Sequence, residues 1–140
     1  MKELTQIDCP DYYESGNVQV RDFLKSYKFD FCLGNVIKYV ARAGKKPESD
    51  YHDDLEKALN YLNYEINYED DSVRTALFSD YEAKLKLKDF LKAFNFNPLI
   101  EKIIFLITMS CYVEDYSYYK TCLKIARYFL EALIERENAC

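Results

Sequence analysis

Apolar residues recur three or four positions apart through most of the chain, which is the spacing of one face of an α-helix. Around Leu33, for example, apolar residues follow at positions 36, 37, 40 and 41, with polar residues between them. This pattern predicts five amphipathic helices, over Val18–Tyr27, Leu33–Ala43, Tyr51–Tyr68, Pro98–Val113 and Ser117–Asn138.

The stretch "KLKLKDF" (Lys84–Phe90) alternates between apolar and polar residues like a strand. Its Leu, Lys and Ala content and its continuation into "FLKAF" favour a helix instead, which we expect to begin at about Asp80. Three glycines and three prolines supply few turns for a sandwich or barrel. We therefore predict a single all-α domain over residues 1–140, with Gly44 as a left-handed helix cap and Ser49 or Asp50 capping the helix that follows.

The two halves of the chain resemble each other. "RDFLKSYKFDF" (Arg21–Phe31) matches "KDFLKAFNFNP" (Lys88–Pro98) at an offset of 67 residues, 21 to 88. The same offset pairs Lys57 with Lys124 and Tyr61 with Tyr128. We interpret this as an internal duplication of a three-helix unit, although amphipathic helices share a period and part of the match could arise by chance. The motif-bearing repeat spans residues 10–69 and the second repeat spans 80–138.

The basic stretch "FCLGNVIKYVARAGKK" is present in the first repeat and absent from the second. Within a helix, positions 35, 38 and 42 share one face, and position 39 lies beside them. Arginine and lysine side chains gathered in this way suit a phosphate or diphosphate, although a basic face near a helix C-terminus can also simply be solvated. The residues concerned are Asn35, Lys38, Tyr39, Arg42, Lys45 and Lys46.

Composition narrows the class of protein. A net charge of -5 argues against a general nucleic-acid coat, so an anion site must be local. Five cysteines without a CxxC pair and a single histidine make a zinc site or a disulfide framework improbable and fit a reducing cytosol. The longest apolar run, "LITMSCYV", is too short to span a bilayer. We expect a cytoplasmic protein without membrane association.

The stretch "DFCLGNVIKYVARAGKK" followed by "DDLEKALNYLNYEI" resembles the small phage domain often labelled SaV-like or "nucleotide kinase". The resemblance covers about residues 10–67, and Tyr12 and Tyr13 stand where the family usually has a His-Tyr pair. It implies a phage origin, a location in the host cytoplasm and a nucleotide ligand, and it leaves open whether the ligand is turned over. Single copies of the domain would be expected to pair between chains, whereas here the second repeat supplies part of that face within the chain. We also expect a homo-oligomer.

Three functions remain open from the sequence. The first is a protein that binds a nucleotide or nucleotide-derived molecule without turnover, for example to sequester a host defence signal, and it needs no cofactor. The second is a metal-dependent nucleoside monophosphate kinase without a P-loop, since no GxxxxGK[ST] motif is present. Asp53, Asp54 and Glu56 could hold the Mg²⁺ that it would need. The third is a protein–protein interaction module. The ligand residues are expected to be Asn35, Lys38, Tyr39, Arg42, Lys45, Lys46, Lys57 and Tyr61, and no catalytic residue is assigned.

Overall fold

The computed structural model describes residues 14–15, 18–27, 29–45, 51–68 and 85–138. These residues form six helices and one antiparallel pair of two-residue strands, so the predicted all-α class is confirmed. The paired strands are β1 (Glu14–Ser15) and β2 (Val18–Gln19). The helices are α1 (Val20–Tyr27), α2 (Phe31–Arg42), α3 (Tyr51–Asn67), α4 (Leu87–Phe94), α5 (Pro98–Ser110) and α6 (Tyr116–Asn138).

Local capping chemistry fixes several of these boundaries. Asp30 begins α2 by accepting a hydrogen bond from the backbone N–H of Leu33. Asn97 begins α5 in the same way, by accepting from Leu99, and Pro98 occupies the first turn. Gly44 lies just beyond α2 with φ of 77°, which confirms the predicted left-handed residue at this turn.

Several predicted boundaries were wrong. Val18 and Gln19 form β2, so α1 begins at Val20 rather than Val18, and α2 begins at Phe31 rather than Leu33 because Asp30 caps it. Lys86 occupies the N-cap position of α4, so this helix begins at Leu87 rather than near Asp80 within the residues described here. α5 ends at Ser110 rather than Val113, because the N–H groups of Tyr112 and Val113 bond three residues back instead of four. The predicted cap at Ser49 or Asp50 lies outside the described residues.

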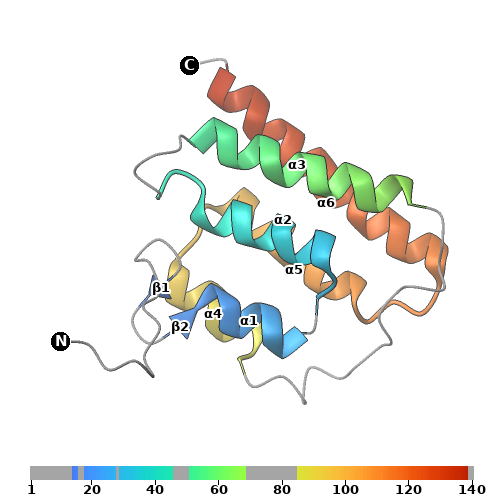
Figure 1. Cartoon of the computed structure of the whole chain (residues 1–140), viewed down its shortest axis with the longest axis horizontal. Helices are drawn as coiled ribbons and strands as arrows, with labels where there is room; N and C mark the ends of the chain where they lie inside the picture. Colours follow the sequence, from blue (N-terminus) through green and yellow to red (C-terminus); the bar gives the residue numbers. More distant parts are fainter. Residues whose placement is uncertain (1–13, 16–17, 28, 46–50, 69–84, 139–140) are drawn as a thin grey trace.

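The helices form three tiers (Figure 1), with α3 and α6 in the first, α2 and α5 in the second and α1 and α4 in the third. α3 and α6 pack side by side and run in opposite directions. Lys120 near the start of α6 accordingly donates to the backbone carbonyls of Glu65 and Ile66 at the end of α3. None of the helices in the described part of the chain is long and apolar enough to cross a membrane.

The two halves have the same order of helices and nearly the same boundaries. Adding the offset of 67 to the bounds of α1 (residues 20–27) gives the bounds of α4 (residues 87–94). The same offset relates the first residues of α2 and α5, which are 31 and 98. The Phe23 ring stacks on Phe90, its own counterpart at this offset, with 4.1 Å between centroids. Contact between equivalent residues is what a two-fold arrangement produces on its axis. The corresponding buried residues are Val20, Phe23, Tyr27, Val36 and Ile37 in the first half, and Leu87, Phe90, Phe94, Ile103 and Ile104 in the second.

The long helices correspond at an offset of 68, not 67. Burial in α3 falls on Leu55, Ala58, Leu62 and Ile66, and burial in α6 falls on Leu123, Ala126, Leu130 and Ile134. This one-residue shift makes Phe129, and not Tyr128, the counterpart of Tyr61. Tyr128 is 71% exposed, so the sequence pairing of Tyr61 with Tyr128 does not correspond to a shared structural position. A common origin of the two halves stays a prediction.

Candidate functional site

Three cationic side chains meet at the ring of Tyr39 on α2. The Arg42 guanidinium carbon lies 4.6 Å from the ring centroid, and the Lys38 ammonium lies at 5.1 Å. A third cation, the ammonium of Lys57, reaches the same ring from α3 at 5.7 Å. All three distances fall within the range of a cation–π interaction. The structure therefore brings together four of the predicted site residues, and we call them the Tyr39 cluster.

Arg42 is more deeply placed than its sequence position indicated. It is only 5% exposed, and its Nε lies 3.1 Å from Oδ1 of Asp54, which is fully buried. The end of α2 packs against the start of α3, and the guanidinium therefore lies between the helices instead of on an open face. Removing one partner of such a buried pair leaves the other charge unpaired, which destabilises the fold. The sequence placed Arg42 on the same helix face as Lys38, and its burial against Asp54 means that truncating it should harm the fold.

An open groove of about 350 Å³ begins next to this cluster. Tyr61 on α3 forms part of its wall and stacks on Tyr39 with 6.0 Å between ring centroids. Phe31 forms another part of the wall, is 74% exposed, and meets the Tyr61 ring edge-on at 5.8 Å. Cys32, Asn60 and Tyr64 complete the lining. Through these ring contacts Tyr61 of α3 packs against α2 and connects the Tyr39 cluster to the groove.

Sequence reasoning did not select Phe31, Cys32 or Asn60 for the site. Phe31 is the first residue of α2, and its helical spacing alone does not distinguish a core position from an exposed one. Its exposure is the feature that marks it, and that feature requires the structure. Asn60 lies one turn beyond Lys57 on the exposed side of α3, and this spacing could have suggested it.

Three other predicted ligand residues are not shown to join the cluster. Asn35 donates from its side chain to the carbonyl of Phe31 on its own helix. Lys45 reaches the other way, with its ammonium 4.9 Å from the Phe94 ring centroid and 5.2 Å from that of Phe96. Partial burial in this apolar setting lowers the Lys45 pKa. The single site expected for all the cations is therefore divided, and Lys46 lies outside the described residues.

The acids that could hold Mg²⁺ are not gathered into one site. Asp54 is engaged with Arg42, and Glu56 lies 3.3 Å from His52 one turn earlier on α3. Asp53 is exposed beside them. Within the part of the chain that the structure describes, no group of three or more His, Cys, Asp or Glu residues is arranged to hold a metal ion.

Cys32 lies in the groove but is poorly suited to act as a nucleophile. Burial raises the pKa of its thiol, and the nearby carboxyl groups of Glu65 and Asp30 raise it further. Glu65 itself accepts a hydrogen bond of 2.6 Å from the Tyr119 hydroxyl. A thiol that stays protonated at neutral pH reacts slowly, so Cys32 contributes shape to the groove.

The counterparts of the Tyr39 cluster in the second half are all apolar. Offsets of 67 for α2 and 68 for α3 place uncharged hydrophobic residues at every one of its positions. The structure therefore supports both kinds of surface on the same helix arrangement. The counterparts of Lys38, Tyr39, Arg42, Lys57 and Tyr61 are Phe105, Leu106, Met109, Ile125 and Phe129.

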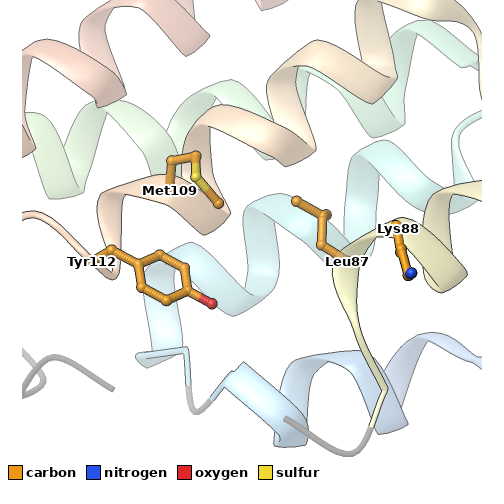
Figure 2. A pocket seen from close by; sticks show the side chains of 4 residues that line it. All are labelled: Leu87, Lys88, Met109 and Tyr112. Atoms are coloured by element: carbon orange, nitrogen blue, oxygen red, sulfur yellow. The ribbon is translucent and has the colours of Figure 1, made fainter. Parts of the chain in front are cut away.

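A second cavity, of about 360 Å³, lies between the start of α4 and the end of α5 (Figure 2). Leu87, Met109 and Tyr112 point toward one another across it, whereas the Lys88 side chain extends away from them. The Tyr112 ring also meets the Tyr27 ring edge-on at 6.4 Å. Its walls are mostly apolar, as are those of the groove beside Tyr39, and what distinguishes that groove is the adjoining contact of Lys38 and Lys57 with the Tyr39 ring.

Comparison with protein families gives one match. Residues 7–63 match the model of a family described as a protein of unknown function, DUF3310. The match includes the Tyr39 cluster and most of the groove, and it ends before the second half of the chain begins. No curated protein and no solved structure matches the chain. The first half is thus similar to an uncharacterised family of small domains.

Proposed function

We propose that this protein binds a nucleotide or nucleotide-derived small molecule at the Tyr39 cluster and the groove beside it. The observation that carries the proposal is the direct contact between a cationic centre and an aromatic groove, made by the stack of Tyr39 on Tyr61. A nucleotide has the same two parts, an anionic phosphate and a flat base, joined by a short sugar.

The phosphate would lie near Lys38 and Lys57. Their ammonium groups approach one ring from two helices, so both can donate to an oxygen-rich anion placed between them. The buried Arg42 guanidinium adds positive charge next to the Tyr39 ring, although its ion pair with Asp54 offsets part of that charge. Such a local site explains how a chain with a net charge of -5 could hold an anion.

The base would lie in the groove. Phe31 and Tyr64 are 74% and 60% exposed, and Tyr61 lies on the groove wall between cluster and groove. Stacking on such rings is worth about 1–3 kcal/mol per base. Asn60 offers an amide that can both donate to and accept from a base edge. The groove volume of about 350 Å³ lies within the usual range for small-molecule sites.

Binding without turnover is the form of the proposal that we favour. The groove thiol of Cys32 is held protonated, and Asp54 is committed to Arg42, so neither is an obvious source of chemistry. A phage-encoded protein of this kind would act by sequestering a nucleotide signal of the host defence. A kinase without a P-loop is the alternative, and it would need Mg²⁺ brought in by the nucleotide.

Retention of nucleotides tests the proposal. The purified protein is incubated with a panel of mononucleotides, cyclic nucleotides and ADP-ribose derivatives, with and without Mg²⁺, and the molecules released by heat are identified by mass. We expect an intact ligand to be retained. A changed mass would favour the kinase, and no retention of any member would favour an interaction module.

The site itself is tested with matched lysine variants. Lys38→Ala combined with Lys57→Ala should weaken binding at least tenfold, as expected when charge-assisted hydrogen bonds worth about 1.5–3 kcal/mol each are lost. The control is Lys25→Ala combined with Lys92→Ala, which removes the same charge from exposed positions on α1 and α4. Equal affinity in the two double variants would place the ligand elsewhere.

A further inference from the structure

Four exposed apolar or aromatic residues, which we call the patch, lie on α5 and α6 in the second half of the molecule. Ile125 and Tyr128 on α6 are 42% and 71% exposed, and Phe105 on α5 is 47% exposed. Tyr118 extends the same stripe by two turns of α6 and is 68% exposed. Positions 118, 125 and 128 share one side of the helix, because they are separated by seven and three residues.

The α5 and α6 members of the patch lie close together. Lys102 on α5 reaches the Phe129 ring on α6, with 5.5 Å between its ammonium and the ring centroid. The helices pack together across the short connection 111–115, as an antiparallel pair does. One turn farther along α5 and back along α6, this arrangement brings Phe105 beside Ile125.

This surface is the counterpart of the ligand face in the first half. Phe105, Ile125 and Tyr128 correspond to Lys38, Lys57 and Asn60 at the offsets that the helices follow. Lys57 and Asn60 keep the outer side of α3 polar, and the equivalent side of α6 is apolar. Clustered exposed hydrophobic side chains mark an interaction surface, and aromatic residues are enriched in such surfaces.

The patch is flanked by one positive and one negative side chain, which would face each other if two copies of this surface met. Lys124 and Glu131 are both exposed, lie seven residues apart and therefore flank the same edge of the stripe. When two α6 helices meet antiparallel about a two-fold axis near residue 127, each Lys124 faces Glu131 of the partner subunit. The same axis brings Ile125 of one copy against Tyr128 of the partner subunit. A two-fold contact needs this kind of self-complementary surface.

We propose that the patch formed by Phe105, Tyr118, Ile125 and Tyr128 is the contact surface for a second copy of this chain, with the two α6 helices antiparallel. A homodimer then leaves both nucleotide sites open, because the Tyr39 cluster lies on α2 and α3. This inference does not depend on the proposed function, since it uses only residues of the second half.

Light scattering coupled to size-exclusion chromatography, over a series of concentrations, tests the dimer. We expect the unmodified chain to be a dimer, and Ile125→Glu or Tyr128→Glu to raise its dissociation constant about 100-fold, as for loss of a central interface residue. Tyr64→Glu makes the matched change on an exposed tyrosine of α3 and should leave the dimer intact. A monomer at every concentration, or a dimer untouched by both α6 substitutions, would overturn the proposal.

Charge reversal keeps the test decisive if the α6 substitutions harm the fold. Lys124→Glu alone and Glu131→Lys alone each place like charges opposite each other in the dimer, and each should weaken it. The double variant restores opposite charges and should recover the original dissociation constant. Within one chain Glu131 lies 3.8 Å from Arg127, so the single variants are checked for folding by circular dichroism. Failure of the double variant to recover dimerisation would rule out the antiparallel contact.

Discussion

The first half of the molecule differs from the second mainly in the residues outside its core. Phe23 and Val36 of the first half are matched by Phe90 and Ile103 of the second, and all four are buried. On the outer side, Lys38 and Lys57 are matched by Phe105 and Ile125. The comparison teaches that the apolar pattern is sufficient for this arrangement of helices, while the surface chemistry varies independently of it.

One difference between the two halves lies in the core and not on the surface. Arg42 and Asp54 are both buried, yet their counterparts, Met109 and Cys122, form no ion pair. The fold therefore accommodates either a charged pair or two uncharged residues at this joint between helices. A buried ion pair is not in itself a source of large net stability, which suggests that it serves the Tyr39 cluster.

The largest effect on stability should come from replacing one member of the Arg42–Asp54 pair by its counterpart from the second half. Arg42→Met removes the guanidinium that faces the buried Asp54 carboxylate and should lower the free energy of unfolding by about 3–5 kcal/mol. Arg42→Met combined with Asp54→Cys should recover most of that loss, because no charge is left unpaired. Chemical denaturation of the three proteins measures both values. A single variant as stable as the unmodified chain would show that the pair is dispensable for folding.

The next effect concerns binding. Lys57→Ile gives α3 the residue that α6 has at the same place, and it should weaken nucleotide binding by about 1.5–3 kcal/mol through loss of a charge-assisted hydrogen bond. Calorimetry with a retained nucleotide measures the change. Lys92→Ile on α4 removes the same charge at an exposed position and serves as the control. Similar affinity in both variants would mean that the two halves do not differ in ligand binding at this position.

A third prediction concerns the joint between the halves. The buried N–H of Leu87 donates to the Tyr27 hydroxyl at 2.9 Å, and the counterpart of Tyr27 is Phe94. Tyr27→Phe makes the two positions identical but leaves that donor unpaired, and it should cost about 1–3 kcal/mol of stability. Thermal unfolding measures the loss. Phe29→Leu, which trims a nearby ring without touching this bond, separates the hydrogen bond from packing.

The smallest effect is a dependence of stability on pH. Burial raises the pKa of Glu65 above its ordinary value of 4.5, and the carboxyl of Asp30 adds to the rise, while Tyr119 and Lys120 oppose it. Since the folded form holds this proton more tightly, Glu65 favours folding at low pH, and that contribution is lost as the pH rises through its folded pKa. The equivalent residue in α6 is Leu133. Glu65→Gln should therefore flatten the stability profile above pH 4.5, and an unchanged profile would contradict this.

The sequence was sufficient to predict the helices because their apolar spacing is regular. It located Gly44 correctly, since a glycine after an apolar stripe marks a helix end. The alignment of α3 with α6 was wrong by one residue, because the identical pair Tyr61 and Tyr128 outweighed a burial pattern that only the structure reveals. The predicted start of α4 was also wrong. Its N-cap residue is Lys86, which makes no side-chain capping hydrogen bond, so the sequence has no capping residue there that marks the helix start.

The candidate site was predictable in part. The spacing of Lys38, Tyr39 and Arg42 correctly put them together, because neighbours on one helix follow from its geometry alone. The directions of Arg42 and Lys45 were not predictable, since each depends on a partner from another helix, Asp54 in one case and Phe94 in the other. Long side chains take their final direction from tertiary contacts that a helical period does not contain.

The stack of Phe23 on Phe90 has a consequence for how such a molecule can change over time. In a symmetric pair of identical chains, every substitution at a two-fold contact occurs twice and meets itself. Here Phe23 and Phe90 are two separate positions of one chain, so one side of the contact can be substituted while the other is retained. A single chain with this arrangement can therefore carry different surfaces on its two sides while keeping the same contact at its centre, as this molecule does.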